Sequence, residues 1–228
     1  MAGKKEKTVP KEKQIVQSCN PLEQSNNKNI ITEKQTVFNP DLDVLSFDKI
    51  ETENIKWLFY PYIPFGKVTI IQGDPGEGKT TLVLEIIARL TNGQPIIDGC
   101  KSFEPMNVVY QTCEDGLSDT IKPRLIKSGA DCSRVHTIID DNVTLTMTDI
   151  RIEETISAKN IKLLVLDPIQ GFLGTDVDMH RANEIRPVMK RLANLAEKYS
   201  CAIILIGHLN KCIQGGKASY RGLGSIDF

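Results

Sequence analysis

The sequence predicts an α/β protein with a mainly parallel sheet, doubly wound by crossover helices, and three observations support this prediction. Short apolar runs alternate along the chain with segments of helical periodicity, which is the pattern of strands joined by crossover helices. The runs are apolar almost throughout, as in strands buried on both faces. A glycine-rich octapeptide follows the first run and leads into a helical segment, which is typical of a strand–loop–helix unit.

The elements follow from these patterns in chain order. Five runs are expected to form strands: Lys67–Gln72, Asn107–Thr112, Val135–Ile139, Ile161–Leu166 and Cys201–Ile206. One helix is expected at Thr80–Leu90, with Leu82, Val83, Ile86, Ile87 and Leu90 on one face. Another is expected at Asn183–Tyr199, with a stripe of Ile185, Val188, Leu192, Leu195 and Tyr199. Both stripes are predicted to be core, because helices in α/β folds bury one face.

The first part of the chain differs from the rest in composition. Residues 1–45 are rich in Lys, Glu, Gln, Asn and Pro, so they are expected to form a disordered polar tail. Five lysines fall in the first 13 residues against two glutamates. A solvated tail is the simpler interpretation, and a basic arm for DNA is the alternative. Residues 46–228 are expected to form the folded core.

The composition excludes several classes of protein. Lys and Arg number 28 against 29 Asp and Glu, so the net charge of −1 gives no sign of a nucleic-acid partner and any such contact must be local. The sequence has no apolar run long enough for a membrane span and no signal-peptide core, which predicts a cytoplasmic protein. The six cysteines show no metal-ligand spacing and are expected to be free thiols.

The octapeptide is the strongest motif in the chain. Its residues Gly73, Asp74, Pro75, Gly76, Glu77, Gly78, Lys79 and Thr80 match the pattern G-x-x-x-x-G-K-[ST], which is a phosphate-binding loop. Its glycines let backbone N–H groups surround phosphate oxygens at the N-terminus of a helix. Lys79 is expected on the β- and γ-phosphates, the Thr80 hydroxyl on Mg²⁺, and Thr81 near the α-phosphate. The predicted ligands are therefore ATP and Mg²⁺.

Acidic and basic side chains are expected at the same edge of the sheet. Asp167 ends the run Ile161–Leu166, where a carboxylate holds Mg²⁺ in phosphate-loop enzymes. Glu114 and Asp115 follow Asn107–Thr112, and Glu114 is preferred as the group that polarises the attacking water, while Asp115 also suits a helix N-cap. His208 follows Cys201–Ile206 and is predicted to touch the γ-phosphate, with a purely structural histidine as the alternative.

These motifs together resemble a known family. The segments GDPGEGKTT, YQTCEDGLSDTIKPRL, LLVLDPIQG and IGHLNK resemble RecA-like AAA-type ATPases of mobile elements, close to the plasmid RepA hexameric helicase and more distantly DnaB, RadA and RecA. The resemblance implies a RecA-like core, ATP hydrolysis, action on single-stranded DNA, and assembly of copies into a ring such as a hexamer. It implies that Glu114 is the catalytic glutamate, Asp167 the magnesium aspartate and His208 the phosphate sensor, and that Arg124 lies near the nucleotide.

The resemblance also bears on the end of the chain. The segment GGKASYRG resembles the second DNA-contacting loop of RecA-like proteins, with Lys217 and Arg221 for phosphates and Tyr220 for base stacking. A mobile glycine hinge is the alternative. Family members continue with further sheet strands, so the C-terminal strands are expected to be missing from this sequence.

Three functions remain open at this point. The first is an ATP-driven DNA motor of the helicase type acting in replication. The second is a RadA- or RecA-like ATPase of DNA repair or recombination. The third, of another class, is a KaiC-like nucleotide switch that binds protein partners.

Overall fold

The computed structural model describes residues 44–99, 102–140, 143–175, 177–178 and 181–208. The chain divides into two units, residues 1–53 and 54–228. In the first unit the described part holds a short 3-10 turn, η1 (Phe47–Lys49), and the side chain of Phe47 is 90% exposed. The predicted polar tail falls almost wholly outside the described residues, so its extent stays a prediction.

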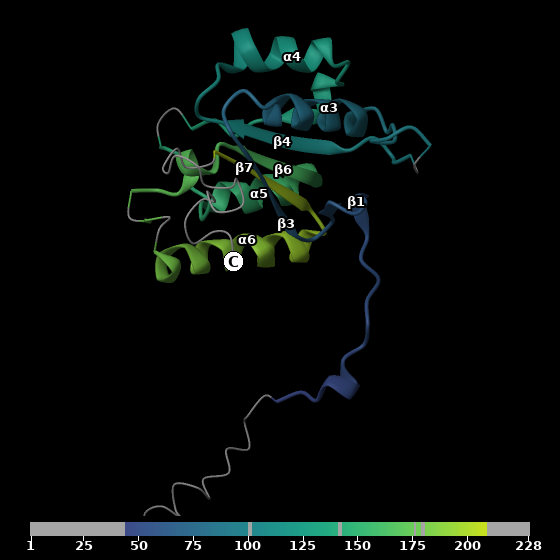
Figure 1. The fold of residues 1–228 in the computed structure, drawn as a ribbon, viewed down its shortest axis with the longest axis vertical. Coiled ribbons are helices and arrows are strands. Elements are labelled where there is room, and N and C mark those ends of the chain that lie inside the picture. Colours follow the sequence, from purple (N-terminus) through teal and green to yellow (C-terminus); the bar gives the residue numbers. More distant parts are fainter. Residues whose placement is uncertain (1–43, 100–101, 141–142, 176, 179–180, 209–228) are drawn as a thin grey trace, which may run out of the picture. The chain divides into compact units, whose positions relative to one another are not determined.

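The second unit is built on a five-stranded parallel sheet (Figure 1). Its strands, in spatial order, are β3 (Val68–Gly73), β7 (Ala202–His208), β6 (Ile161–Asp167), β4 (Asn107–Thr112) and β5 (Val135–His136). All pairs are parallel, so all carboxyl ends lie along one edge of the sheet. The predicted α/β, RecA-like fold is therefore confirmed.

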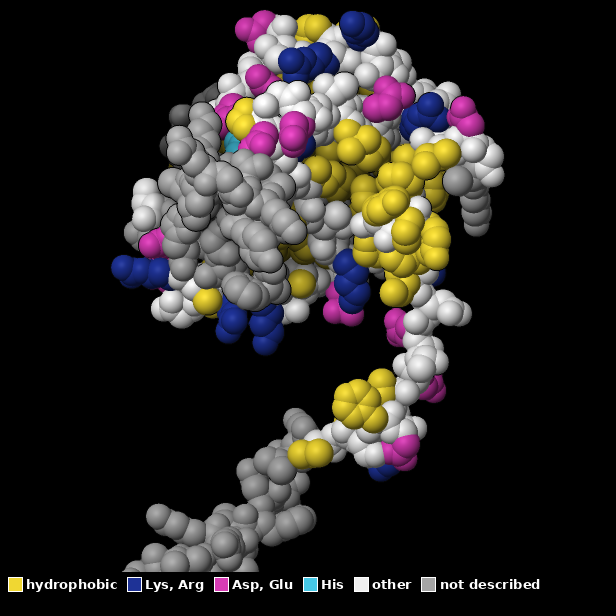
Figure 2. Space-filling model, in the orientation of Figure 1, with side chains coloured by type: hydrophobic (Ala, Val, Ile, Leu, Met, Phe, Trp, Pro, Cys, Tyr) yellow, Lys and Arg dark blue, Asp and Glu magenta, His cyan; other side chains and the backbone are white. Residues whose placement is uncertain are grey.

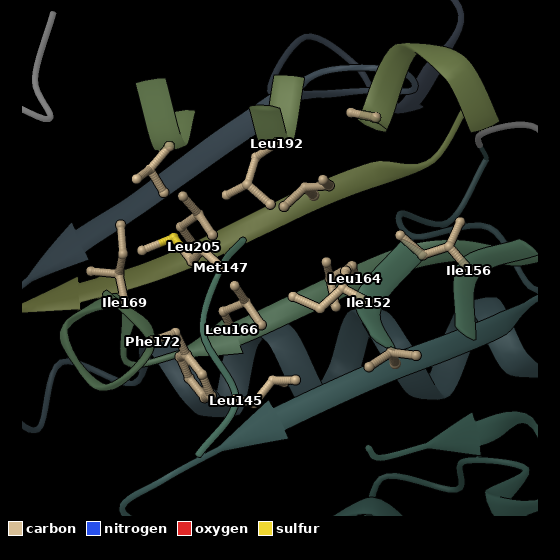
Figure 3. Close-up of a cluster of buried hydrophobic side chains, with 14 of the residues drawn as sticks. Leu145, Met147, Ile152, Ile156, Leu164, Leu166, Ile169, Phe172, Leu192 and Leu205 are labelled. Atoms are coloured by element: carbon tan, nitrogen blue, oxygen red, sulfur yellow. The ribbon is translucent and has the colours of Figure 1, made fainter. Parts of the chain in front are cut away.

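Helices cover both faces of the sheet (Figure 1). One face packs against α3 (Lys79–Thr91) and α4 (Lys122–Lys127), and the other packs against α5 (Ile150–Lys159) and α6 (Ala182–Tyr199). Figure 3 shows the core on the second face, where Leu164, Leu166 and Leu205 from the strands meet Ile156 of α5 and Leu192 of α6. Successive strand residues enter opposite cores, because side chains alternate between the faces of a strand.

The observed elements differ from the predicted ones in three respects. Helix α5 was not among the predicted elements, because only Ile152 and Ile156 of this helix are buried. Leu82 was predicted to lie on the buried face of the first helix but is 50% exposed, while Leu84 is buried. The predicted strand Val135–Ile139 ends at His136, since the Gln111 side chain bonds both the N–H and the carbonyl of Ile138 in place of a backbone ladder.

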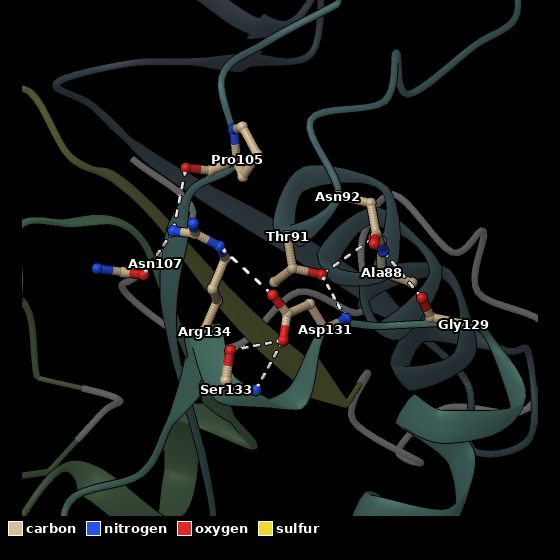
Figure 4. A network of polar contacts seen from close by, with 9 residues as sticks. All are labelled: Ala88, Thr91, Asn92, Pro105, Asn107, Gly129, Asp131, Ser133 and Arg134. Atoms are coloured by element: carbon tan, nitrogen blue, oxygen red, sulfur yellow. Dashed lines mark hydrogen bonds and ion pairs between the residues drawn. The ribbon is translucent and has the colours of Figure 1, made fainter.

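Polar contacts fix the C-terminal end of α3 (Figure 4). The Thr91 hydroxyl accepts a hydrogen bond from the backbone N–H of Asp131, and the Asn92 amide donates to the carbonyl of Gly129. The Asp131 carboxylate accepts from Ser133 and lies 3.5 Å from the guanidinium of Arg134. Burial of Val83, Ile87 and Leu90 adds the larger share of stability. The helix that carries the phosphate loop is therefore held along its length.

A short antiparallel hairpin precedes the sheet. It consists of β1 (Trp57–Phe59) and β2 (Ile63–Pro64), with Leu58 and Ile63 in the α3 core. Tyr60 and Tyr62 at its turn are 72% and 66% exposed, and Figure 2 shows hydrophobic side chains gathered on this side of the molecule. Among the described residues, no helix is long and apolar enough to cross a membrane.

Two leucines of α3 test the corrected helix face. Leu84→Ala removes a fully buried side chain and should lower the free energy of unfolding by about 2–5 kcal/mol, since it leaves a cavity. Leu82→Ala on the exposed face should change it by less than about 0.5 kcal/mol. Urea unfolding followed by circular dichroism measures both. Equal losses for the two variants would place Leu82 in the core and contradict the observed helix orientation.

Candidate active site

The phosphate loop joins β3 to α3 in a strand–loop–helix unit. Gly76 and Gly78 adopt φ values of 87° and 84°, in the left-handed region that favours glycine. A Cβ at either position would meet nothing within 4 Å, so these glycines are required for backbone conformation rather than for space. Gly78 is the N-cap of α3 and brings no side chain to the free N–H groups of the first turn. Those N–H groups and the helix dipole form an anion site.

Two charged side chains brace the loop from within. The Lys79 ammonium donates hydrogen bonds to the carbonyls of Gly73 and Asp74, both at 2.9 Å. An ammonium has three donors, so one remains for a phosphate oxygen. The Glu77 carboxylate accepts from the Asp74 N–H at 2.7 Å, while the Glu77 N–H donates to the Asp74 carbonyl. This reciprocal pair fixes the turn over residues 74–77.

A carboxylate from the centre of the sheet meets the first turn of α3. The Thr80 hydroxyl donates to Oδ2 of Asp167 at 2.8 Å, which joins two residues 87 positions apart in sequence. The hydroxyl of Tyr110, on β4, donates to the same oxygen at 2.7 Å. Burial and the neighbouring Asp167 charge raise the pKa of Tyr110 far above its ordinary value, so the phenol stays protonated and can only donate here. Asp167 itself is buried.

This arrangement fits a magnesium ion. The proton of the Thr80 hydroxyl is committed to Asp167, which leaves the lone pairs of that oxygen for a cation. Hard oxygen donors of this kind suit Mg²⁺, which keeps several waters and is completed by substrate phosphates rather than by a protein cage. The described residues contain no cluster of three or more His, Cys, Asp or Glu that could hold a metal ion.

Glu114 and His208 approach each other at the same edge. Nε2 of His208 lies 3.6 Å from Oε2 of Glu114, and the glutamate side chain is exposed. Nδ1 of His208 is buried and has no hydrogen-bond partner among the described residues. The Thr112 hydroxyl accepts from the backbone N–H groups of Glu114 and Asp115, both at 3.3 Å, and so shapes the turn that presents Glu114. Glu114 follows the end of β4 and His208 ends β7, and these two strands are separated by β6.

The neighbouring acid faces a different partner. Asp115 lies 3.9 Å from the guanidinium of Arg124 on α4. Asp115 is not the N-cap that the sequence allowed: Gly116 occupies that position before a π-helical turn, η2 (Leu117–Ile121), because the turn begins one residue later. The two acids therefore have different partners: Glu114 lies near His208, and Asp115 lies near Arg124.

A cavity of about 300 Å³ lies over the loop, lined by Gly76, Gly78, Lys79, Thr80, Thr81, Arg124 and His208. Its size is at the lower end of small-molecule sites. Its lining contains several side chains that were predicted to contact the nucleotide, including Arg124 from α4. A larger cavity of about 380 Å³ lies beside Met106 and Asn107 at the opposite ends of the strands, but the phosphate loop takes no part in its lining.

Some residues of the site were not predicted, and some predicted residues cannot be placed. Tyr110 and Thr112 read as ordinary strand residues, and only their position two residues apart on the strand that leads to Glu114 hinted at a role. Lys217, Tyr220 and Arg221 lie outside the described residues. Of the six cysteines, Cys113, Cys132 and Cys201 are described, and all three are free thiols as predicted.

Comparison with known proteins agrees with this geometry. A family model described as an AAA domain matches residues 33–214. The DNA repair protein RadA of Streptococcus pyogenes serotype M3 is 26% identical over 178 residues, which cover 75% of this chain and 34% of the relative. RadA of Bacillus subtilis is 26% identical over 149 residues, 64% of this chain and 28% of the relative. The chain thus spans about a third of the length of these curated relatives. The resemblance to RadA is confirmed, whereas those to RepA and DnaB and an origin on mobile elements stay predictions.

Lys79 provides the direct test of the cavity. Lys79→Ala removes the ammonium that faces the phosphates and should weaken Mg-ATP binding or lower turnover by about 100-fold or more. Lys127→Ala on the exposed surface of α4 is the matched control and should leave both unchanged. Equilibrium binding of a fluorescent ATP analogue and phosphate release measure the two effects. Wild-type binding and turnover in Lys79→Ala would rule out this cavity as the nucleotide site.

Proposed function

This chain belongs to the AAA domain family, and from that premise we propose that it binds Mg-ATP, hydrolyses it and couples hydrolysis to action on DNA. The observation that carries the proposal is a cavity lined by the phosphate loop, Arg124 and His208, in which Thr80 donates to Asp167 and His208 lies 3.6 Å from Glu114. Each group has the chemistry that phosphoryl transfer needs at its position.

The residues divide the work of the reaction among them. The loop N–H groups and Lys79 bind the phosphates, and Thr80 with Asp167 holds the Mg²⁺, which when bound neutralises charge on the phosphate oxygens. Glu114 polarises the attacking water, because its carboxylate is exposed and lies near His208, which lines the cavity. Arg124 pairs with Asp115 instead. His208 contacts the γ-phosphate, and its Nε2 lies 3.6 Å from Oε2 of Glu114, so a movement of His208 on loss of the phosphate also changes the surroundings of Glu114. Arg124 approaches the nucleotide from α4.

Glu114 should separate binding from hydrolysis. Glu114→Gln keeps the phosphate cradle but removes the carboxylate, so ATP affinity should remain while the hydrolysis rate falls by about 100-fold or more. Single-turnover phosphate release and nucleotide binding are measured on the same preparation.

The neighbouring residue supplies the matched control. Asp115→Asn alters the contact with Arg124 but not the group assigned to the water, so it should retain most of the hydrolysis rate. The reverse result, with Asp115→Asn inactive and Glu114→Gln active, would assign the catalytic acid to Asp115.

The DNA part of the proposal has two forms. The similarity to the DNA repair protein RadA favours a repair or recombination ATPase. The alternative is a helicase-type motor in replication, assembled as a ring of copies such as a hexamer. DNA-stimulated ATPase activity separates both forms from a KaiC-like switch that binds protein partners, and unwinding of a forked duplex separates the motor from the repair ATPase.

The predicted contact with single-stranded DNA is tested by charge removal. Lys217→Ala with Arg221→Ala should lower the affinity and reduce the slope of log K against log salt by about 1.4, because two phosphate contacts are lost. Lys4→Ala with Lys5→Ala is the matched control for the alternative of a basic N-terminal arm. Fluorescence anisotropy at several salt concentrations measures both, with ATP binding as the check on folding.

The possible results lead to different conclusions. A loss confined to the Lys4 and Lys5 variant would move the DNA contact to the tail. Unchanged affinity and slope in both variants would place the DNA contact on other residues, whereas a wild-type protein that does not bind DNA would favour the nucleotide switch.

A further inference from the structure

Tyr110 on β4 is fully buried, and its side chain brings a polar atom, the phenol hydroxyl, to the candidate site. Its side chain is 1% exposed and lies in the core beneath α3 and α4. A hydroxyl in such surroundings requires a hydrogen-bond partner, and this one has Oδ2 of Asp167 at 2.7 Å. Phenylalanine would fill the same space without the hydroxyl, so packing alone does not explain tyrosine here.

The parallel register explains how the hydroxyl reaches the carboxylate. Tyr110 pairs with Val165 on β6, and Asp167 lies two residues farther along the same strand, opposite Thr112. Residues two apart share a face of the strand and are about 6.6 Å apart. The tyrosine ring therefore runs along the sheet toward its carboxyl edge, and its hydroxyl arrives beneath the Asp167 side chain.

Both donors occupy one oxygen of the carboxylate. Thr80 and Tyr110 donate to Oδ2 at 2.8 and 2.7 Å, from α3 and from β4. Two bonds from opposite elements fix the rotation of the carboxylate plane, and they leave Oδ1 for the water shell of a cation. Groups that hydrogen-bond a metal ligand in this way orient it and tune the affinity for the metal.

We propose that Tyr110 is a positioning residue of the magnesium site: its hydroxyl holds the Asp167 carboxylate in the orientation that Mg²⁺ requires, and so sets the Mg²⁺ dependence of nucleotide binding. This inference deepens the proposed function and rests on it, because it assigns a role in the same site. Tyr110 contacts neither the nucleotide nor the cation and acts through Asp167 alone.

The test is Tyr110→Phe, which keeps the ring and removes one donor. The Mg²⁺ concentration that half-saturates the binding of fluorescent ADP should rise by about 10- to 100-fold. Binding of the same nucleotide in excess EDTA should match wild type, since the phosphate loop is untouched. The readout is nucleotide affinity titrated against Mg²⁺, so it does not depend on turnover.

The chain offers a matched control for the loss of a tyrosine hydroxyl. Tyr199 donates to Glu153 at 3.2 Å, between α6 and α5 and away from the cavity. Tyr199→Phe removes a similar bond to a carboxylate and should leave the Mg²⁺ titration unchanged. A purely structural role for Tyr110 would lower the melting temperature in Tyr110→Phe without moving the Mg²⁺ midpoint, and that result would overturn the proposal.

A second variant makes the coupling explicit. Asp167→Asn should itself raise the Mg²⁺ concentration that half-saturates nucleotide binding. Adding Tyr110→Phe to that variant should raise this midpoint no further, because Tyr110 acts through Asp167. An additive shift in the double variant would refute this route. Wild-type protein that binds nucleotide without any Mg²⁺ effect would refute the proposed function itself, whereas a Mg²⁺ effect that Tyr110→Phe leaves intact would refute only the role of Tyr110.

Discussion

Parallel pairing in register is the constraint on which the candidate site depends. Gly73 at the start of the phosphate loop pairs with His208, and Thr112 before the acidic turn pairs with Asp167. These two register pairs bring four strand ends to one edge of the sheet. A slip of one residue on β6 would turn Asp167 to the opposite face, because side chains alternate along a strand. The positions of the functional side chains at this edge therefore depend on the backbone hydrogen bonds that set the register of the strands.

The helices convert this edge into a rigid site. α3 is held by its apolar face along its length, by Lys79 at its first turn and by the contacts of Thr91 and Asn92 at its last. A helix fixed at both ends presents its N-terminal N–H groups in one direction, so the anion site is organised by the protein's own contacts. Preorganised dipoles of this kind cost no rearrangement when charge develops in a reaction.

The two sides of the site differ in their surroundings. Asp167 is buried, with Thr80 and Tyr110 on one of its oxygens, whereas the Glu114 side chain is exposed and its carboxylate lies 3.6 Å from His208. A buried carboxylate with two donors is suited to hold a cation in a fixed place. An exposed one on a short turn is suited to a step in which water must enter and a side chain must move. The difference in burial matches the different roles proposed for the two acids.

The sequence by itself determined the fold class, the phosphate loop and the strand-end carboxylates. Each depends on local patterns: continuous apolar runs, a glycine spacing that fixes backbone conformation, and an acid placed directly after a strand. Only the tertiary structure decided the orientation of Leu82, the early end of β5 and the contacts of Tyr110 and Asp115. Those features depend on partners distant in sequence, such as Gln111 for Ile138 and Asp167 for Tyr110. The residues next to Tyr110 or Ile138 in the sequence do not identify such a partner, because only the packing of the sheet brings the two residues together.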